Sequence, residues 1–216
     1  MQNIKWLGFS LPGVKTIIHF LPAAINISAP YPVFAKLTIF NESFGKRSVS
    51  LEGPRLGHPD GIRLDSAFPD TGEESLTSFG VLVELFSKQP YISLAPSNCI
   101  FEFVQNSHSV RFMPKLLISG KNSLPEPPYR SSEKAVGSYM VVNGGMSSCK
   151  FPRFLNSPEL NGRGFVAPFD IAFLEELELT GDALPESVPQ ETGTSNAVYV
   201  LYFERLSRSL LSVMEI

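Results

Sequence analysis

Phe79-Gly-Val-Leu-Val-Glu-Leu-Phe86 is the stretch that decides the fold class, because its apolar side chains recur with a period of two. One face carries Glu84, and the opposite face carries Phe79, Val81, Val83 and Leu85. This alternation is typical of a β-strand that is buried on at least one face. Similar runs of β-branched and aromatic residues predict further strands at residues 33–40, 98–104, 110–112, 138–142 and 197–203.

Long helices have little room in this chain. The sequence contains 16 Gly and 18 Pro, and inside a helix Pro costs about 3 kcal/mol and Gly about 1 kcal/mol relative to Ala. The predicted strand segments follow one another through connections of two to five residues, which are too short for parallel crossovers, so they pair antiparallel or switch between sheets: 79–86, 91–95, 98–104 and 109–113. We therefore predict an all-β fold, a two-sheet antiparallel β-sandwich of jelly-roll type.

Two local signals refine this prediction. Asn143-Gly144 directly follows residues 138–142 and predicts a type I′ turn that leads into a second hairpin strand at residues 146–154. Residues 169–180 are predicted to be mostly strand, paired with residues 197–203.

The remaining segments complete the predicted domain. Leu206, Leu210 and Met214 recur at helical spacing, which suggests a short C-terminal helix or, alternatively, apolar residues that dock on a partner. Residues 119–137 and 181–196 lack apolar periodicity and are predicted to be long surface loops. We prefer a single domain over residues 1–216, because neither side of the first loop contains enough predicted strands for two closed sheets.

The composition excludes several classes of protein. With 43% hydrophobic and 18% charged residues, the chain is neither disordered, nor collagen-like, nor a coiled coil. The net charge of −3 lacks the basic excess that binding to a phosphate backbone requires, so we expect no nucleic-acid partner. No run approaches the ~18 apolar residues of a membrane-spanning helix, so we expect no membrane span.

The first thirty residues and the cysteines bear on the compartment. An apolar stretch after Lys5 resembles an export signal, but Pro12, Lys15, His19 and Pro22 interrupt it. A cytoplasmic location is therefore favoured over secretion, which stays an alternative. Cys99 and Cys149 have no metal-binding spacing, and two buried free thiols are favoured over one disulfide.

The charges are distributed unevenly along the chain. Residues 1–163 contain 16 Lys and Arg against 12 Asp and Glu, whereas residues 164–204 contain eight acidic residues and no Lys or Arg. A solvated face is the simpler interpretation of this acidic stretch. The alternative is a surface that contacts a basic partner or the basic part of a second copy, with these candidate partner-facing residues: Asp170, Glu175, Glu176 and Glu178.

The most polar short segment of the chain is residues 57–65. Its candidate ligand-binding residues are His58, Asp60, Arg63 and Asp65. Two carboxylates and an imidazole could hold a cation, but their spacing is not that of an EF-hand loop. Pro59-Asp60-Gly61 also satisfies the requirements of a plain β-turn, which is the favoured interpretation.

No recognised catalytic motif is present. The sequence lacks a nucleophile elbow, a phosphate-binding Gly-rich loop and a His-Glu-x-x-His zinc motif. Glu84 and Glu102 lie within apolar strands, and they would share a site if those strands paired. We expect instead that both point to solvent, as polar residues of antiparallel sheets ordinarily do. We therefore lean towards a protein that is not an enzyme, with no cofactor, no metal and no catalytic residues.

Three functions remain open. The leading hypothesis is a non-catalytic interaction or assembly protein that binds another protein or its own copies. The alternative is a carbohydrate-binding module that uses loop aromatics, for which the candidates are Trp6, Tyr31, Tyr91 and Tyr129. The third is an unfamiliar metal-dependent hydrolase built on His58, Asp60 and Asp65.

Overall fold

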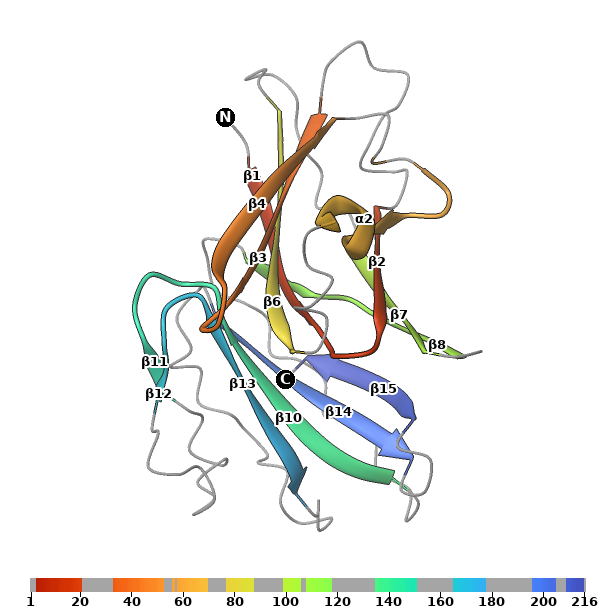
Figure 1. Cartoon of the computed structure of the whole chain (residues 1–216), viewed down its shortest axis with the longest axis vertical. Helices are drawn as coiled ribbons and strands as arrows, with labels where there is room; N and C mark the ends of the chain where they lie inside the picture. Colours follow the sequence, from red (N-terminus) through yellow and green to blue (C-terminus); the bar gives the residue numbers. More distant parts are fainter. Residues whose placement is uncertain are drawn as a thin grey trace.

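The described part of the protein is mostly antiparallel β-structure (Figure 1). The computed structural model describes residues 3–20, 33–52, 56, 58–69, 77–87, 99–105, 108–117, 135–150, 165–177, 196–204 and 209–215. Every strand pair in this part of the chain is antiparallel. The same residues include a short α-helix, α2 (Leu64–Ala67). The predicted all-β class is confirmed, but the strands form three larger sheets and a small ribbon.

Sheets A and B form one end of the molecule. Sheet A has the strand order β4 (Gly45–Glu52), β3 (Val33–Asn41), β6 (Phe79–Ser87), β1 (Asn3–Ser10) and β9 (Lys115–Leu117). Sheet B has the order β5 (Ile62–Arg63), β2 (Lys15–Phe20), β7 (Cys99–Gln105) and β8 (His108–Phe112). Consecutive described strands change between the two sheets six times, at β1–β2, β2–β3, β4–β5, β5–β6, β6–β7 and β8–β9.

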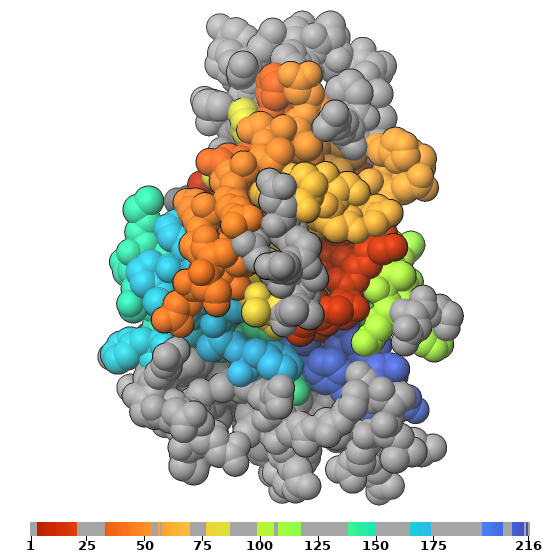
Figure 2. Space-filling view, viewed as in Figure 1, coloured from red at the N-terminus to blue at the C-terminus, as the bar shows by residue number. Residues whose placement is uncertain are grey.

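Sheet C lies at the other end of the view in Figure 1. Its order is β13 (Asp170–Leu177), β10 (Ala135–Asn143), β14 (Asn196–Glu204) and β15 (Leu210–Glu215). Beside it lies the ribbon formed by β11 (Cys149–Lys150) and β12 (Phe165–Val166). In Figure 2, the blue residues of β15 lie next to the green residues of β8, and β15 contacts β8.

Strand β1 is buried on both faces because it lies between sheets B and C. Trp6 and Gly8 face sheet B, where they meet Phe20 and Phe101. Leu7 is fully buried on the opposite side. A strand covered on both faces has no reason to alternate polar and apolar residues. One core cluster accordingly joins side chains from all three larger sheets.

Tyr199 of β14 connects sheet C to sheet A. Its side chain is 0% exposed, and its hydroxyl donates a hydrogen bond to the Leu7 carbonyl. The backbone N–H of Lys115 donates to the same hydroxyl at 2.9 Å. Leu7 and Lys115 are paired residues of β1 and β9, so one phenol bridges two neighbouring strands of the facing sheet.

The predicted hairpin at Asn143-Gly144 is wrong. Strand β10 is flanked by β13 and β14, so neither edge is open to residues 146–154. Residues 149–150 pair with β12 instead. The Asn143 side chain is fully buried and donates to the carbonyls of Ser147, Val166 and Ala167, while its oxygen accepts from the Gly145 N–H. This amide therefore organises a wider turn.

The predicted C-terminal helix is also wrong, because residues 210–215 form β15 against β14. A spacing of four residues fits a helix, but four is an even number and fits a strand equally well. A register shift near Tyr202 places both Leu210 and Val213 in the core, although they are an odd number of residues apart. Leu211 lies between them and is 50% exposed.

Two further expectations have a mixed outcome. Residues 170–177 are a strand, as predicted, but they pair with β10 and not with β14, since β10 lies between the two. The loops predicted at 119–137 and 181–196 fall almost wholly outside the described residues, apart from residues 135–137 and 196, which are strand. Within the part of the chain that is described, no helix has the length and apolarity to cross a membrane.

Candidate functional site

The outer face of sheet B mixes apolar and charged side chains. The strand register places Arg63, Ile17, Glu102 and Arg111 in one row across the four strands. The adjacent rows add residues of the same face on β2, β7 and β8, and Met113 directly follows β8. We call this surface the sheet B face: Lys15, Ile17, His19, Arg63, Ile100, Glu102, Val104, Ser109, Arg111 and Met113.

The apolar members of the sheet B face are incompletely covered. Ile17, Ile100 and Val104 are half-buried, and Met113 is 63% exposed. The exposed face of an antiparallel sheet is ordinarily polar. The opposite face of the same strands carries Ile18, Phe101 and Phe103, all of which belong to the core. Sheet B therefore presents apolar side chains in both directions.

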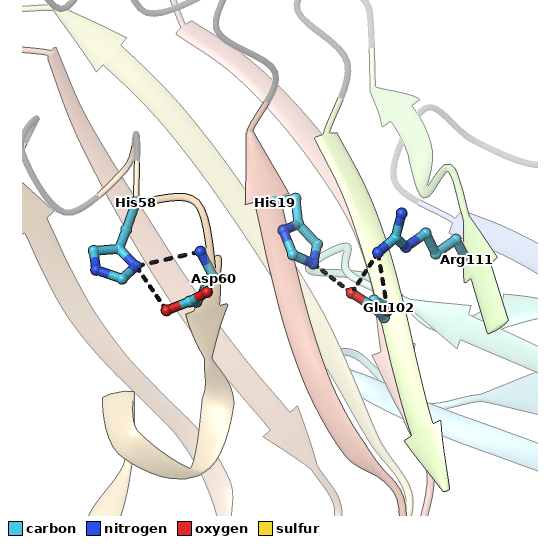
Figure 3. Close-up of polar contacts among 5 residues, drawn as sticks. All are labelled: His19, His58, Asp60, Glu102 and Arg111. Atoms are coloured by element: carbon cyan, nitrogen blue, oxygen red, sulfur yellow. Dashed lines mark hydrogen bonds and ion pairs between the residues drawn. The ribbon is translucent and has the colours of Figure 1, made fainter. Parts of the chain in front are cut away.

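Glu102 is the centre of the sheet B face (Figure 3). The residue is 8% exposed, and its Oε2 lies 2.7 Å from His19 Nε2. Because a carboxylate only accepts hydrogen bonds, this geometry puts a proton on His19 Nε2. Arg111 Nη2 lies 3.2 Å from Oε1 and 3.3 Å from Oε2. Glu102 thus lies on the outer face of its sheet, as expected, but it does not point freely to solvent, because His19 and Arg111 cover it.

The environment of Glu102 favours its charged form. Burial alone would raise the pKa of this carboxyl, but hydrogen bonds from His19, Arg111 and Ser109 together outweigh burial and hold the pKa below its usual value. The carboxylate thus stays ionised near neutral pH, with most of its acceptor positions used. Its chemical role in this arrangement is to orient His19 and Arg111.

The turn at residues 58–61 packs against this cluster. The N–H of Gly61 donates to the His58 carbonyl at 3.0 Å, which confirms the β-turn. Gly61 has φ +70°, and a Cβ there would lie 2.6 Å from Ile17 Cγ2 and 2.8 Å from the His19 ring. Only glycine fits this close approach without displacing His19.

The four predicted ligand-binding residues form two local pairs at the β5 edge of the sheet B face. His58 Nδ1 lies 3.7 Å from Asp60 Oδ2, and both side chains are mostly exposed (Figure 3). Arg63 Nε donates to Asp65 Oδ1 at 3.1 Å, and this bond lowers the pKa of Asp65 more than burial raises it. Within the described ranges, no group of three His, Cys, Asp or Glu side chains is arranged to hold a metal ion. A ligand role for these residues stays a prediction.

The acidic stretch is described in part. Asp170 Oδ1 accepts a hydrogen bond from the Glu42 N–H at 2.9 Å. Glu175 and Glu176 lie on β13, an edge strand of sheet C. Glu178 lies outside the described residues.

The remaining candidate residues do not form a shared site. Glu84 and Glu102 lie in different sheets. Glu84 Oε1 instead lies 2.7 Å from Lys5 Nζ. Trp6 is 3% exposed, so it is not a surface aromatic that could stack on a sugar. The remaining aromatic candidates Tyr31, Tyr91 and Tyr129 lie outside the described residues. Cys99 and Cys149 are buried free thiols, as predicted.

Two clefts among the described residues are small. One has a volume of about 60 Å³ and is lined by Ser10, Thr16, Lys15, Asp65 and neighbouring apolar side chains. The other, about 10 Å³, lies between Val14, His108 and Leu210. Ligand pockets ordinarily measure about 300–1,000 Å³. Neither cleft can enclose a sugar ring, so recognition at these places has to use the surface.

The central residue that sequence reasoning missed is His19. The strand pattern around it is an alternation of Thr16, Ile18 and Phe20 with Ile17 and His19. This strand was not predicted, because the region was interpreted as a possible export signal. Searches against protein-family models, curated proteins and solved structures found no match. The function is therefore argued from the geometry of the chain alone.

Proposed function

We propose that this chain is a non-catalytic interaction or assembly protein that binds another protein, or its own copies, through the sheet B face. The observation that carries the proposal is the outward-facing apolar surface of sheet B, where Met113 is 63% exposed beside the half-buried Ile100. Several apolar side chains on one outer face suggest an interaction site, whereas single exposed ones are ordinary.

The polar centre of the face supports the same function. Met and Arg are enriched at protein interfaces, and Met adapts to partners of different shape. Arg111 is held by Glu102, so less side-chain entropy is lost when a partner binds it. A catalytic interpretation of His19 and Glu102 is less favoured, because the carboxylate is already engaged by several donors.

The jelly-roll topology belongs to the same proposal. Two of the crossings between sheets A and B, from β1 to β2 and from β6 to β7, connect neighbouring strands, since β1 pairs with β6 and β2 pairs with β7. Jelly rolls share this arrangement, and many of them serve in assembly and recognition.

The test compares two exposed methionines. Wild-type protein, Met113→Asp and Met146→Asp are immobilised and exposed to lysate, and the bound proteins are quantified by mass spectrometry. Met146 is 85% exposed and lies outside the sheet B face, so it is a matched control. We expect Met113→Asp to lose a partner that wild type and Met146→Asp retain. An identical set of bound proteins for all three would refute the proposal.

A further inference from the structure

Strand β4 is a long and regular edge strand of sheet A. Its eight residues pair with β3 in an unbroken register, and none of the described strands pairs with its other edge (Figure 1). Such an edge offers a row of unpaired backbone N–H and C=O groups to a further strand. The strand contains no Pro, and all of its side chains are exposed except Val49 and Leu51. Its backbone can therefore pair with another chain.

The other sheet edges in the described part of the chain carry features that oppose such pairing. Strands β5, β11 and β12 have two residues each, and β9 has three. Strand β8 contacts β15. Register shifts interrupt the pairing of β13 with β10 and of β15 with β14. Short, covered or bulged edges are the means by which natural sheets prevent edge-to-edge association. Among the described edges, β4 is long, regular and without such a feature.

The sequence of β4 is complementary to a second copy of itself. In an antiparallel pair of two β4 strands centred on Val49, Lys46 of each copy lies opposite Glu52 of the other. These residues are six positions apart, an even number, so both side chains lie on the same face of sheet A. Opposite charges directly across a strand pair stabilise it. A register centred on Ser48 or Ser50 instead would lose both charge pairs, so the charges select one register.

Both charges of this pair are accessible to a second copy. Lys46 and Glu52 are exposed, and Glu52 makes no ion pair with the described residues. The Lys46 Nζ lies 3.9 Å from the centroid of the Phe169 ring. An ammonium group has three N–H donors, so a contact with one ring face leaves donors for a carboxylate. Phe169 also contacts Phe40, the β3 neighbour of Lys46, and so keeps the ammonium on this face of the sheet.

We propose that two copies of this chain associate through their β4 edges, as an antiparallel strand pair centred on Val49. The pairing joins the two A sheets into one continuous sheet, with backbone hydrogen bonds supplying the contact and the two Lys46–Glu52 pairs fixing the register. Because each copy offers the same surface, the contact closes as a two-fold dimer. The dimer uses a different sheet from the sheet B face, so the inference goes beyond the proposed function.

The test is a charge exchange, measured on the purified chain by sedimentation equilibrium, with folding checked by circular dichroism. We expect wild type to dimerise. Lys46→Glu and Glu52→Lys each place like charges opposite one another at both ends of the contact, so each should raise the dissociation constant at least about tenfold. An equimolar mixture of the two variants should regain the wild-type affinity, because every new charge then faces an unlike one.

A cross-link tests the register and does not depend on the charge variants. Opposite Cβ atoms of an antiparallel pair are about 4.5–5.5 Å apart, close to the separation in a disulfide. Val49→Cys should therefore form a disulfide-linked dimer with a copper–phenanthroline oxidant. Met146→Cys is the control, because Met146 is 85% exposed and lies outside β4. The native Cys99 and Cys149 are buried.

The outcomes separate this dimer from binding at the sheet B face. A monomer at all concentrations, a dimer that both charge variants keep, or a mixture of folded variants that does not recover overturns the inference. Cross-linking of Val49→Cys no faster than that of Met146→Cys also overturns it, and this result decides if a charge variant fails to fold. A dimer lost only in Met113→Asp overturns the β4 pairing and supports the proposed function. A monomer whose lysate partner is lost in Met113→Asp overturns the dimer alone.

Discussion

Replacing Tyr199 with Phe tests how sheets A and C are joined. The substitution removes only the hydroxyl, because Phe keeps the ring that packs 4.9 Å from the Phe9 ring. The Leu7 carbonyl then loses a donor, and the Lys115 N–H loses its acceptor. A buried hydrogen bond contributes about 1 kcal/mol, and an unsatisfied buried group costs about 1–3 kcal/mol, so we expect a loss of about 2–4 kcal/mol.

The same substitution at Tyr202 is the control. Tyr202 lies on the same strand and is 5% exposed, but no hydrogen-bond partner is recorded for its hydroxyl among the described residues. Removing a hydroxyl without a partner relieves a desolvation cost, so Tyr202→Phe should be neutral or stabilising by about 1 kcal/mol. Urea unfolding, followed by fluorescence, measures both free energies. Equal losses for the two variants, or a larger loss for Tyr202→Phe, would refute the bridging role of Tyr199.

Four further outcomes are expected. Glu102→Gln should lower the free energy of unfolding by about 1–3 kcal/mol at pH 7. Because the pKa of Glu102 is depressed in the folded state, wild type keeps this extra stability above about pH 4.3 and loses it as the pH falls through the folded-state pKa. Urea unfolding of both proteins at neutral and acidic pH measures the difference. Gly61→Ala should lower the free energy of unfolding by about 1–3 kcal/mol, since it strains a positive φ and meets Ile17; an unchanged melting curve would contradict the described turn. Burial raises the pKa of the Cys99 and Cys149 thiols, so a disulfide reagent at pH 8 should label both only after unfolding, and rapid labelling of the native protein would contradict their burial. Met113→Asp should change stability by less than about 0.5 kcal/mol, since the side chain is exposed; a large loss in calorimetry would mean that Met113 packs within its own chain.

The strands that sequence reasoning predicted alternate clearly or are rich in β-branched and aromatic residues, and they include residues 197–203, which are buried on both faces. Residues 79–86 and 98–104 alternate clearly, and both form strands. Strand β1 was not predicted, because its central residues Trp6–Phe9 are buried on both faces and show no polar–apolar alternation. Strand β4 was missed for the opposite reason, since most of its side chains are exposed.

The sheet B face could be predicted only in part. The turn at Pro59-Asp60-Gly61 follows from residue type, because Pro fixes φ and Gly accepts a positive one. The cluster around Glu102 depends on which strands are neighbours, and His19 is 83 residues away along the chain. Nothing in local periodicity encodes that pairing, so a strand-centred carboxylate looks like an ordinary solvent-facing residue until the register is known.

Asn143 has a consequence for the chemical ageing of the protein. An Asn-Gly dipeptide deamidates readily when the glycine nitrogen can reach the side-chain carbonyl carbon. Here the amide nitrogen donates to three carbonyls and the oxygen accepts from Gly145, so cyclisation would have to break four hydrogen bonds. Conversion to Asp would also leave an acceptor-only carboxylate facing three carbonyl oxygens. The packing of Asn143 against the ribbon therefore also protects one of the two Asn-Gly dipeptides of the sequence from deamidation.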